Sequence, residues 1–239
     1  ATLQGHHFSI RELADPTPAQ GQLLVRPLFT GICGSDLSLR KQMAEADEAT
    51  PPEAHGQLPV IIPGHEFSAE LVGIAPGTET ALKLGQIVSA LPFTHGHDAP
   101  QAIGLSPDHS GGLATLTCVD AARTFAIPED VPADLGALTE PVSVGLHAAN
   151  LASRNAGPNM VIGCGPVGLS VILALRLQGR GPILAADFSP ERRAVAAALG
   201  ADIVLDPATE SPFGRWTDFA FTPHPMSPLL EREFHGLPP

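Results

Sequence analysis

Residues 161–169 read VIGCGPVGL, and this stretch decides the class of fold. Gly163, Gly165 and Gly168 follow a short apolar run and open a longer one, which fits a turn from a buried strand into a helix. There, the first glycine permits the tight turn, the second lets a pyrophosphate approach the backbone, and the third lets helix and strand pack closely. Without a strand before it and a helix after it, the pattern would be only a glycine-rich corner.

The flanking sequence supplies both elements and then repeats them. Ser189 precedes the second helix as an N-cap with Pro190 at its first position, and Gly179 and Gly200 are suited to ending the two helices. This alternation predicts a parallel sheet with right-handed crossovers. The expected elements are strands at 160–163, 182–187 and 202–206 and helices at 166–179 and 190–199.

The first half of the chain has a different pattern. Short β-type runs between Gly, Pro and Asp predict a small antiparallel or barrel-like domain. We expect loops at 41–59 and 93–112, and helical structure in the mostly apolar stretch 132–152. The β-type runs lie at 22–32, 68–74, 86–91 and 113–119.

Composition excludes some classes of function. The formal net charge of −12 leaves no basic face for nucleic acid or an anionic membrane. The apolar runs are far shorter than the roughly 20 residues of a membrane span. Three widely spaced cysteines make a poor disulfide framework and suit a reducing compartment, so we expect a cytoplasmic protein.

The glycine turn predicts a dinucleotide site. Free N–H groups at the helix N-terminus attract phosphates, and Asp187, which ends the second strand, is placed to accept hydrogen bonds from the adenosine ribose. Its charge would repel a 2′-phosphate and favours NAD, whereas Arg192 nearby could receive one. The predicted cofactor-binding residues are Gly163, Gly165, Pro166, Val167, Gly168, Asp187 and Arg192.

Three other motifs carry metal-ligand residue types. GICGSDL (31–37) contains Cys33, PGHEF (63–67) contains His65 and Glu66, and TEPVSVGLHA (139–148) contains Glu140. Thiolate, imidazole and carboxylate are the ligands of zinc sites that keep an open position. Spacing alone leaves open whether these side chains meet.

Taken in order, GICGSDL, PGHEF, GGLAT, EPVSVGLHA and VIGCGPVGL resemble the zinc-dependent medium-chain dehydrogenase/reductase family, nearest to its polyol type, the sorbitol, 2,3-butanediol and threonine dehydrogenases. The resemblance covers roughly residues 9–211. It implies an α/β fold in which a GroES-like, β-barrel-type catalytic domain (1–148) precedes a Rossmann nucleotide-binding domain. We expect only the first, partial half of that doubly wound domain (149–211), followed by a tail of unclear structure (212–239).

The resemblance also implies roles for single residues. Cys33 and His65 would bind one catalytic zinc ion, with Glu66 or Glu140 as the third ligand, and Asp36 would orient His65. Ser35 would contact the substrate oxygen and begin a proton relay. The implied reaction transfers a hydride between a secondary alcohol or polyol and NAD. The expected catalytic residues are Ser35, Cys33, His65 and Glu66.

The sequence departs from the family in three places. Residues 93–111 lack the four cysteines that hold a structural zinc ion in many members, so we expect none here. Ser38 stands where many members have a relay histidine. The family's last three sheet strands have no counterpart, which leaves a non-catalytic remnant that binds zinc or adenosine as the alternative function. The expected partner is a small alcohol or polyol, with a homo-oligomer as an open alternative to a monomer, and neither nucleic acid nor a membrane is expected.

Overall fold

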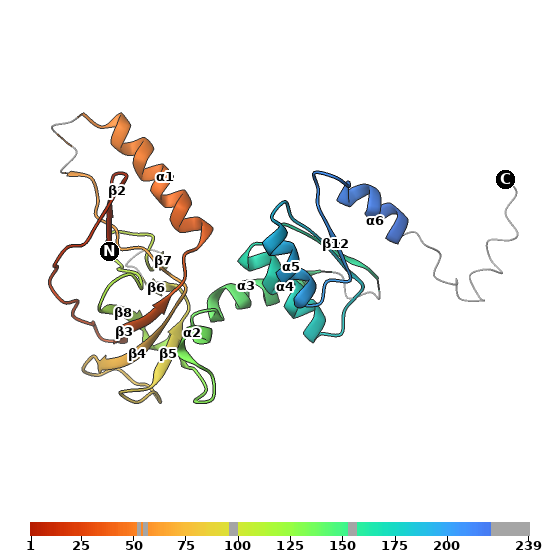
Figure 1. Cartoon of the computed structure of the whole chain (residues 1–239). Helices are drawn as coiled ribbons and strands as arrows, with labels where there is room; N and C mark the ends of the chain where they lie inside the picture. The colour runs from red at the N-terminus through yellow and green to blue at the C-terminus, as the bar shows by residue number, and fades with distance from the viewer. Residues whose placement is uncertain (52–53, 55–56, 96–99, 153–156, 221–239) are drawn as a thin grey trace, which may run out of the picture. The chain divides into compact units, whose positions relative to one another are not determined.

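The chain forms two compact units, divided inside one helix. The computed structural model describes residues 1–51, 54, 57–95, 100–152 and 157–220. The first unit is Ala1–Glu140 and the second begins at Pro141 (Figure 1). The boundary predicted after residue 148 falls within the same helix, α3 (Thr139–Leu151), as the observed division.

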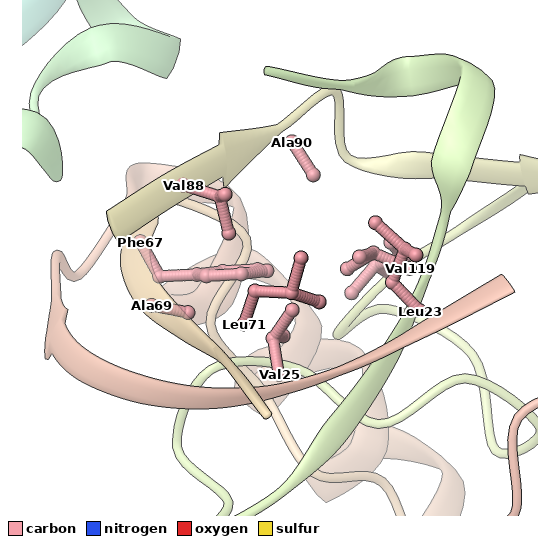
Figure 2. Close-up of a cluster of buried hydrophobic side chains, with 9 residues drawn as sticks. Leu23, Val25, Phe67, Ala69, Leu71, Val88, Ala90 and Val119 are labelled. Carbon is pink, nitrogen blue, oxygen red and sulfur yellow. The ribbon is translucent and has the colours of Figure 1, made fainter. Parts of the chain in front are cut away.

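A five-stranded antiparallel sheet forms the centre of the first unit. Its strands occur in the order β8-β3-β4-β5-β9. Side chains alternate across a strand, so every second residue of β4 faces the interior: Phe67, Ala69 and Leu71 are almost fully buried. Figure 2 shows them meeting Val25 and Val88 from the neighbouring strands. The strands are β3 (Gln22–Thr30), β4 (Phe67–Ile74), β5 (Ile87–Ala90), β8 (Thr117–Asp120) and β9 (Thr124–Ala126).

The main error of the sequence analysis is the helix α1 (Gly34–Ala49), part of which falls in a segment predicted to be a loop. Most of its residues are exposed, and Met43 is its only fully apolar buried side chain, so it shows little hydrophobic periodicity. Its Leu, Arg, Lys, Gln, Met, Ala and Glu residues are strong helix formers, and this propensity was the signal available.

Two hairpins and two short helical segments are the remaining described elements before α3. The hairpin of β6 and β7 corrects the loop predicted at 93–112, and residues 96–99 between its strands lie outside the described part. The remaining elements are β1 (Thr2–Gln4), β2 (His7–Ser9), β6 (Phe93–His95), β7 (Pro100–Ala102), η2 (Ala121–Arg123) and α2 (Ala133–Gly136).

The second unit has the predicted parallel sheet, with order β10-β11-β12. One face carries Val161, Ile183 and Ala185, which pack with side chains of α4 and α5. The other face forms a separate buried cluster that includes Leu184 and Ala186. Every residue of β11 is buried, as expected for a central parallel strand. The elements are β10 (Asn159–Ile162), α4 (Pro166–Leu177), β11 (Ile183–Ala186), α5 (Pro190–Ala198) and β12 (Ile203–Leu205).

The predicted helix ends are confirmed in detail. The Ser189 side chain accepts a hydrogen bond from the Arg192 N–H and caps α5, and Gly179 and Gly200 take positive φ angles of 66° and 106° just past α4 and α5. The tail is more ordered than expected at its start, because Pro212–Ala220 form the helix α6. Residues 221–239 of the predicted tail lie outside the described part. Among the described helices, none has both the length and the apolar character that a bilayer crossing requires.

Candidate metal centre and glycine turn

Strand pairing brings the two predicted ligand motifs together. β3 and β4 run antiparallel with Thr30 opposite Phe67, so the residues after Thr30 and those before Phe67 emerge at the same end of the pair. A hydrogen bond from the Gly31 N–H to the Glu66 carbonyl, 2.7 Å long, continues the pairing into these segments. Cys33 and His65 are therefore neighbours although they are far apart in sequence.

Cys33, His65 and Glu66 form a compact donor set. Each offers one ligand atom, and these atoms all lie within 4.8 Å of one another. His65 and Glu66 are buried, and Cys33 is partly exposed. Gly31 makes room for the set, since a Cβ on this residue would lie 2.5 Å from Glu66 Oε2.

Asp36 fastens this arrangement from the first turn of α1. Its Oδ2 accepts the Cys33 N–H at 2.8 Å, and its Oδ1 lies 3.4 Å from the Gly64 nitrogen and 3.5 Å from His65 Nδ1. One carboxylate thus holds the backbone of both ligand segments. This is the position beside His65 that the resemblance implied for Asp36.

Contacts within and beside the donor set shift the pKa values of His65 and Asp36. The Asp36 carboxylate, followed by Cys33, outweighs burial and raises the pKa of His65 to about 9. Burial alone would raise the pKa of Asp36, but contacts with His65 and the Cys33 and Gly64 N–H groups hold that pKa below its ordinary value. The site therefore stabilises a positive charge among its donors.

Two serines of the helix start have separate partners. Ser35 Oγ lies 3.1 Å from His65 Nε2, so its hydroxyl borders the donor set. Ser38 Oγ donates to the Gly34 carbonyl at 3.0 Å, a bond within α1. Of the two hydroxyls, only that of Ser35 is joined to the donor set by these bonds.

Glu140 lies outside the group of three donors found among the described residues. Burial raises the pKa of its carboxyl group, the charge of His65 lowers it, and that of Glu66 raises it further. Glu140 thus lies within the electrostatic reach of the donor set. Of the two glutamates predicted as alternative third ligands, Glu66 is the one whose carboxylate lies within 4.8 Å of the ligand atoms of Cys33 and His65.

The donor set fits a zinc ion. Thiolate, imidazole and carboxylate are zinc ligands, and three of them leave a coordination position open. His65 Nδ1 lies 3.5 Å from Asp36 Oδ1, an arrangement in which a carboxylate orients a ligating imidazole. We expected no structural zinc ion in the segment 93–111. Residues 96–99 of this segment, which include His97, lie outside the described part.

In the second unit, each glycine of the turn has a distinct environment. Gly163 has a φ of 89°, a conformation that other residues rarely adopt. A Cβ on Gly168 would lie 1.9 Å from the Gly163 carbonyl oxygen, whereas a Cβ on Gly165 would meet nothing within 4 Å. The turn therefore packs tightly at Gly168 and is open beside Gly165.

The open side is lined by the start of α4. Pro166 occupies its first position and Val167 follows with its side chain partly exposed. The N–H groups of this first turn have no partner further back in the helix, and the helix dipole makes them attractive to an anion. This geometry fits a phosphate-binding turn.

Asp187 connects the glycine turn to the segment that leads into α5. Its Oδ2 accepts the Cys164 N–H at 2.7 Å and its Oδ1 accepts the Ser189 N–H at 2.8 Å. The Ser189 bond, then the Cys164 bond and the charges of Arg192 and Arg193, lower the pKa of Asp187 despite its burial. Sequence reasoning gave Asp187 only a ligand role and missed this structural one.

The two arginines of α5 differ. Arg192 is exposed, with its NH1 atom 3.9 Å from Asp187 Oδ2. Arg193 donates to the carbonyls of Asp187 and Phe188 and pairs with Asp206 at 3.1 Å. Arg192 is thus the cation beside the predicted ribose position, and Arg193 is engaged in the fold.

Comparison with known proteins gives matches over most of the chain. Residues 19–129 match the alcohol dehydrogenase GroES-like domain. The chain is 35% identical over 211 residues to the (R,R)-butanediol dehydrogenase of Bacillus subtilis, covering 83% of this chain and 60% of the relative. It is 30% identical over 213 residues to the L-threonine 3-dehydrogenase of Thermococcus kodakarensis, covering 84% and 58%.

Solved structures give the same result. The crystal structure of 2R,3R-butanediol dehydrogenase from Bacillus subtilis superposes with a TM-score of 0.72 at 27% identity, covering 91% of this chain and 65% of that one. The chain spans about three fifths of the length of the curated relatives it matches. Residues 19–129 therefore belong to the alcohol dehydrogenase GroES-like domain family, and the chain as a whole is similar to butanediol and threonine dehydrogenases.

Proposed function

We propose that the chain acts in a zinc-dependent oxidoreductase that transfers a hydride between a secondary alcohol or polyol and NAD. The observation that carries the proposal is the meeting of Cys33, His65 and Glu66, with ligand atoms within 4.8 Å of one another, beside the Ser35 hydroxyl. Relatives named as butanediol and threonine dehydrogenases support the substrate class.

Cys33, His65 and Glu66 would hold the zinc ion. When bound, zinc acts as a Lewis acid that lowers the pKa of an alcohol hydroxyl. The chain's own part is to fix the donors: Asp36 holds the backbone of Cys33 and Gly64, and Gly31 leaves the Glu66 carboxylate room to point into the set. Ser35 Oγ, 3.1 Å from His65 Nε2, can accept a hydrogen bond from the substrate hydroxyl and begin a relay, taking the departing proton as it passes its own to solvent water.

The glycine turn would hold the cofactor. The free N–H groups at the start of α4 and the open space at Gly165 would receive the pyrophosphate. Each Asp187 oxygen accepts one backbone N–H and retains a lone pair for a ribose hydroxyl. The negative charge of Asp187 favours NAD over a 2′-phosphorylated cofactor. NAD, when bound, accepts the hydride.

A cytoplasmic location is also part of the proposal. Its support is that Cys33, Cys118 and Cys164 are all free thiols, as expected in a reducing compartment.

The test compares Cys33→Ala with Cys118→Ala, a second free cysteine that lies in β8. We expect Cys33→Ala to lose the zinc ion of this donor set, a drop of one ion per chain, together with alcohol-dependent NADH formation, while still binding ADP-ribose, and Cys118→Ala to keep all three. Zinc is measured by elemental analysis and ADP-ribose binding by calorimetry. Full turnover and zinc content in Cys33→Ala would refute the metal assignment. Zinc and ADP-ribose binding without turnover in the unaltered chain would favour the non-catalytic alternative.

A further inference from the structure

A second donor cluster lies in the first unit, apart from the residues assigned above. His6, His7 and Asp47 each offer one ligand atom, and these atoms all lie within 4.8 Å of one another. His6 Nδ1 is 2.6 Å from Asp47 Oδ2, and the two imidazole rings have centroids 3.7 Å apart.

A tight hairpin sets the positions of the histidines. β1 and β2 pair with Gln4 opposite His7, and Gly5 and His6 form the turn between them. Gly5 has a φ of 57°, which a glycine adopts at little cost. Side-chain hydrogen bonds from Thr2 to Ser9 close the base of the hairpin. The two imidazoles are therefore held on a short, braced turn.

A small apolar cluster brings the helix to this turn. Leu3 of β1 packs with Met43 of α1 and with Ile61, and Leu3 and Ile61 exchange two backbone hydrogen bonds of 2.7 and 2.9 Å. Asp47 lies four residues after Met43, on the same helix face. It consequently projects at Gly5 and His6, near the carboxyl end of α1.

Gly5 also leaves the space that Asp47 occupies. A Cβ on Gly5 would lie 2.7 Å from the Asp47 Oδ2 and Cγ atoms. The carboxylate is only 8% exposed, whereas His6 and His7 are exposed. The cluster thus has a buried anionic base and an imidazole rim that faces solvent.

We propose that His6, His7 and Asp47 form a second site for a divalent zinc ion. Two imidazoles and one carboxylate are a zinc ligand set, and the solvent-facing side leaves a position for water. The partial negative charge at the carboxyl end of α1 also favours a cation there. A bound ion joins the hairpin to α1, so it stabilises the first unit by mass action.

The competing interpretation is a hydrogen-bonded His6–Asp47 pair without metal. That pair has no use for His7, so a His7 variant separates the two interpretations. His7→Gln changes an exposed side chain and leaves the Asp47 contact with His6 in place. His147, an exposed histidine of α3, provides the matched control.

The experiment titrates zinc chloride into the metal-free full chain and counts bound ions by native mass spectrometry, with affinity from calorimetry. Cys33→Ser serves as the background because it removes the first donor set, which makes the two sites separable. We expect two ions in the unaltered chain, one in Cys33→Ser, and at least about tenfold weaker zinc binding in Cys33→Ser/His7→Gln, since losing even a residue that only orients a ligand costs about 10–100-fold. Cys33→Ser/His147→Gln should bind as Cys33→Ser does.

A second variant tests the buried base of the site. In the Cys33→Ser background, Asp47→Asn keeps the side-chain shape but removes the charge, and it should weaken zinc binding as much as His7→Gln. Zinc should also raise the thermal unfolding midpoint of Cys33→Ser and not that of the His7 double variant. The proposal is overturned if Cys33→Ser binds no zinc, or if His7→Gln leaves its affinity unchanged. Neither outcome tests the Cys33 site, which is tested separately by comparing Cys33→Ala with Cys118→Ala.

Discussion

Replacing Gly168 by alanine has two effects of opposite sign on the unfolding free energy of the second unit. Alanine favours a helix over glycine by about 1 kcal/mol, and Gly168 lies in α4. The new Cβ, however, would lie 1.9 Å from the Gly163 carbonyl oxygen, and ordinary contact begins at 3.4 Å. The two backbones must therefore separate by about 1.5 Å, which strains the Gly163 N–H bond to the Ala186 carbonyl, 2.8 Å long.

The steric effect wins in this comparison. Overpacking costs typically 1–3 kcal/mol and more when the obstacle is backbone, so we expect Gly168→Ala to lower the unfolding free energy of the second unit by about 2 kcal/mol. That is a roughly 30-fold change in the folding equilibrium. Gly165→Ala is the matched control, because its Cβ meets nothing within 4 Å and its φ of −73° suits alanine.

The assay uses the single tryptophan. Trp216 lies in α6, which contacts β11 of the same unit, so its fluorescence in a urea titration reports unfolding there. Gly165→Ala should unfold almost as the unaltered chain does but bind ADP-ribose about tenfold or more weakly, the cost of one lost hydrogen bond to a charged group. A Gly168→Ala chain as stable as the original would refute the packing argument. Undiminished ADP-ribose binding by Gly165→Ala would refute the placement of the pyrophosphate.

Three further predictions concern the donor set, the acidic limb of stability and the core. Gly31→Ala places a Cβ 2.5 Å from Glu66 Oε2, so zinc affinity measured against a chelator should fall while circular dichroism stays unchanged; equal affinity would mean that Glu66 is no ligand. Because backbone hydrogen bonds from Ser189 and then Cys164 hold the Asp187 pKa below 3.8, its charge stabilises the fold above pH 3.8, and this contribution is lost as pH falls through the lower, folded-state pKa. Asp187→Asn should therefore flatten the pH dependence of Trp216-detected stability below about pH 4, and an unchanged profile would contradict this linkage. Leu71→Ala empties a fully buried position of β4 and should cost about 2–5 kcal/mol in the first unit, detected as faster proteolysis of that unit with Trp216 fluorescence unaltered.

The sequence alone predicted the second unit well, for a physical reason. Its strands and helices are consecutive, each end is marked by a residue with a local conformational role, and crossover handedness leaves few topologies. Ser189 and Gly200 act through the backbone next to them, so their roles are readable without the fold. The same holds for the first half's β3, β4 and β5, whose alternating apolar residues became the buried core.

What local patterns could not give was which side chains meet. Cys33 and His65 are united by the β3–β4 register. The residue types of Cys33, His65 and Glu66 were compatible with zinc, but their spacing left open whether they meet, and only the family resemblance favoured a shared site. The second role of Asp187, as acceptor for the Cys164 and Ser189 N–H groups, required the three-dimensional turn.

The cluster of His6, His7 and Asp47 shows most clearly the difference between what local sequence patterns determine and what only tertiary packing decides. Local conformational preference accounts for the turn at Gly5, where φ is 57°, and for the helix through Asp47, which was wrongly predicted to lie in a loop. Only the packing of Leu3 against Met43 and Ile61 decided that the end of that helix lies on that turn, because burial of apolar surface joins segments without regard to their separation along the chain.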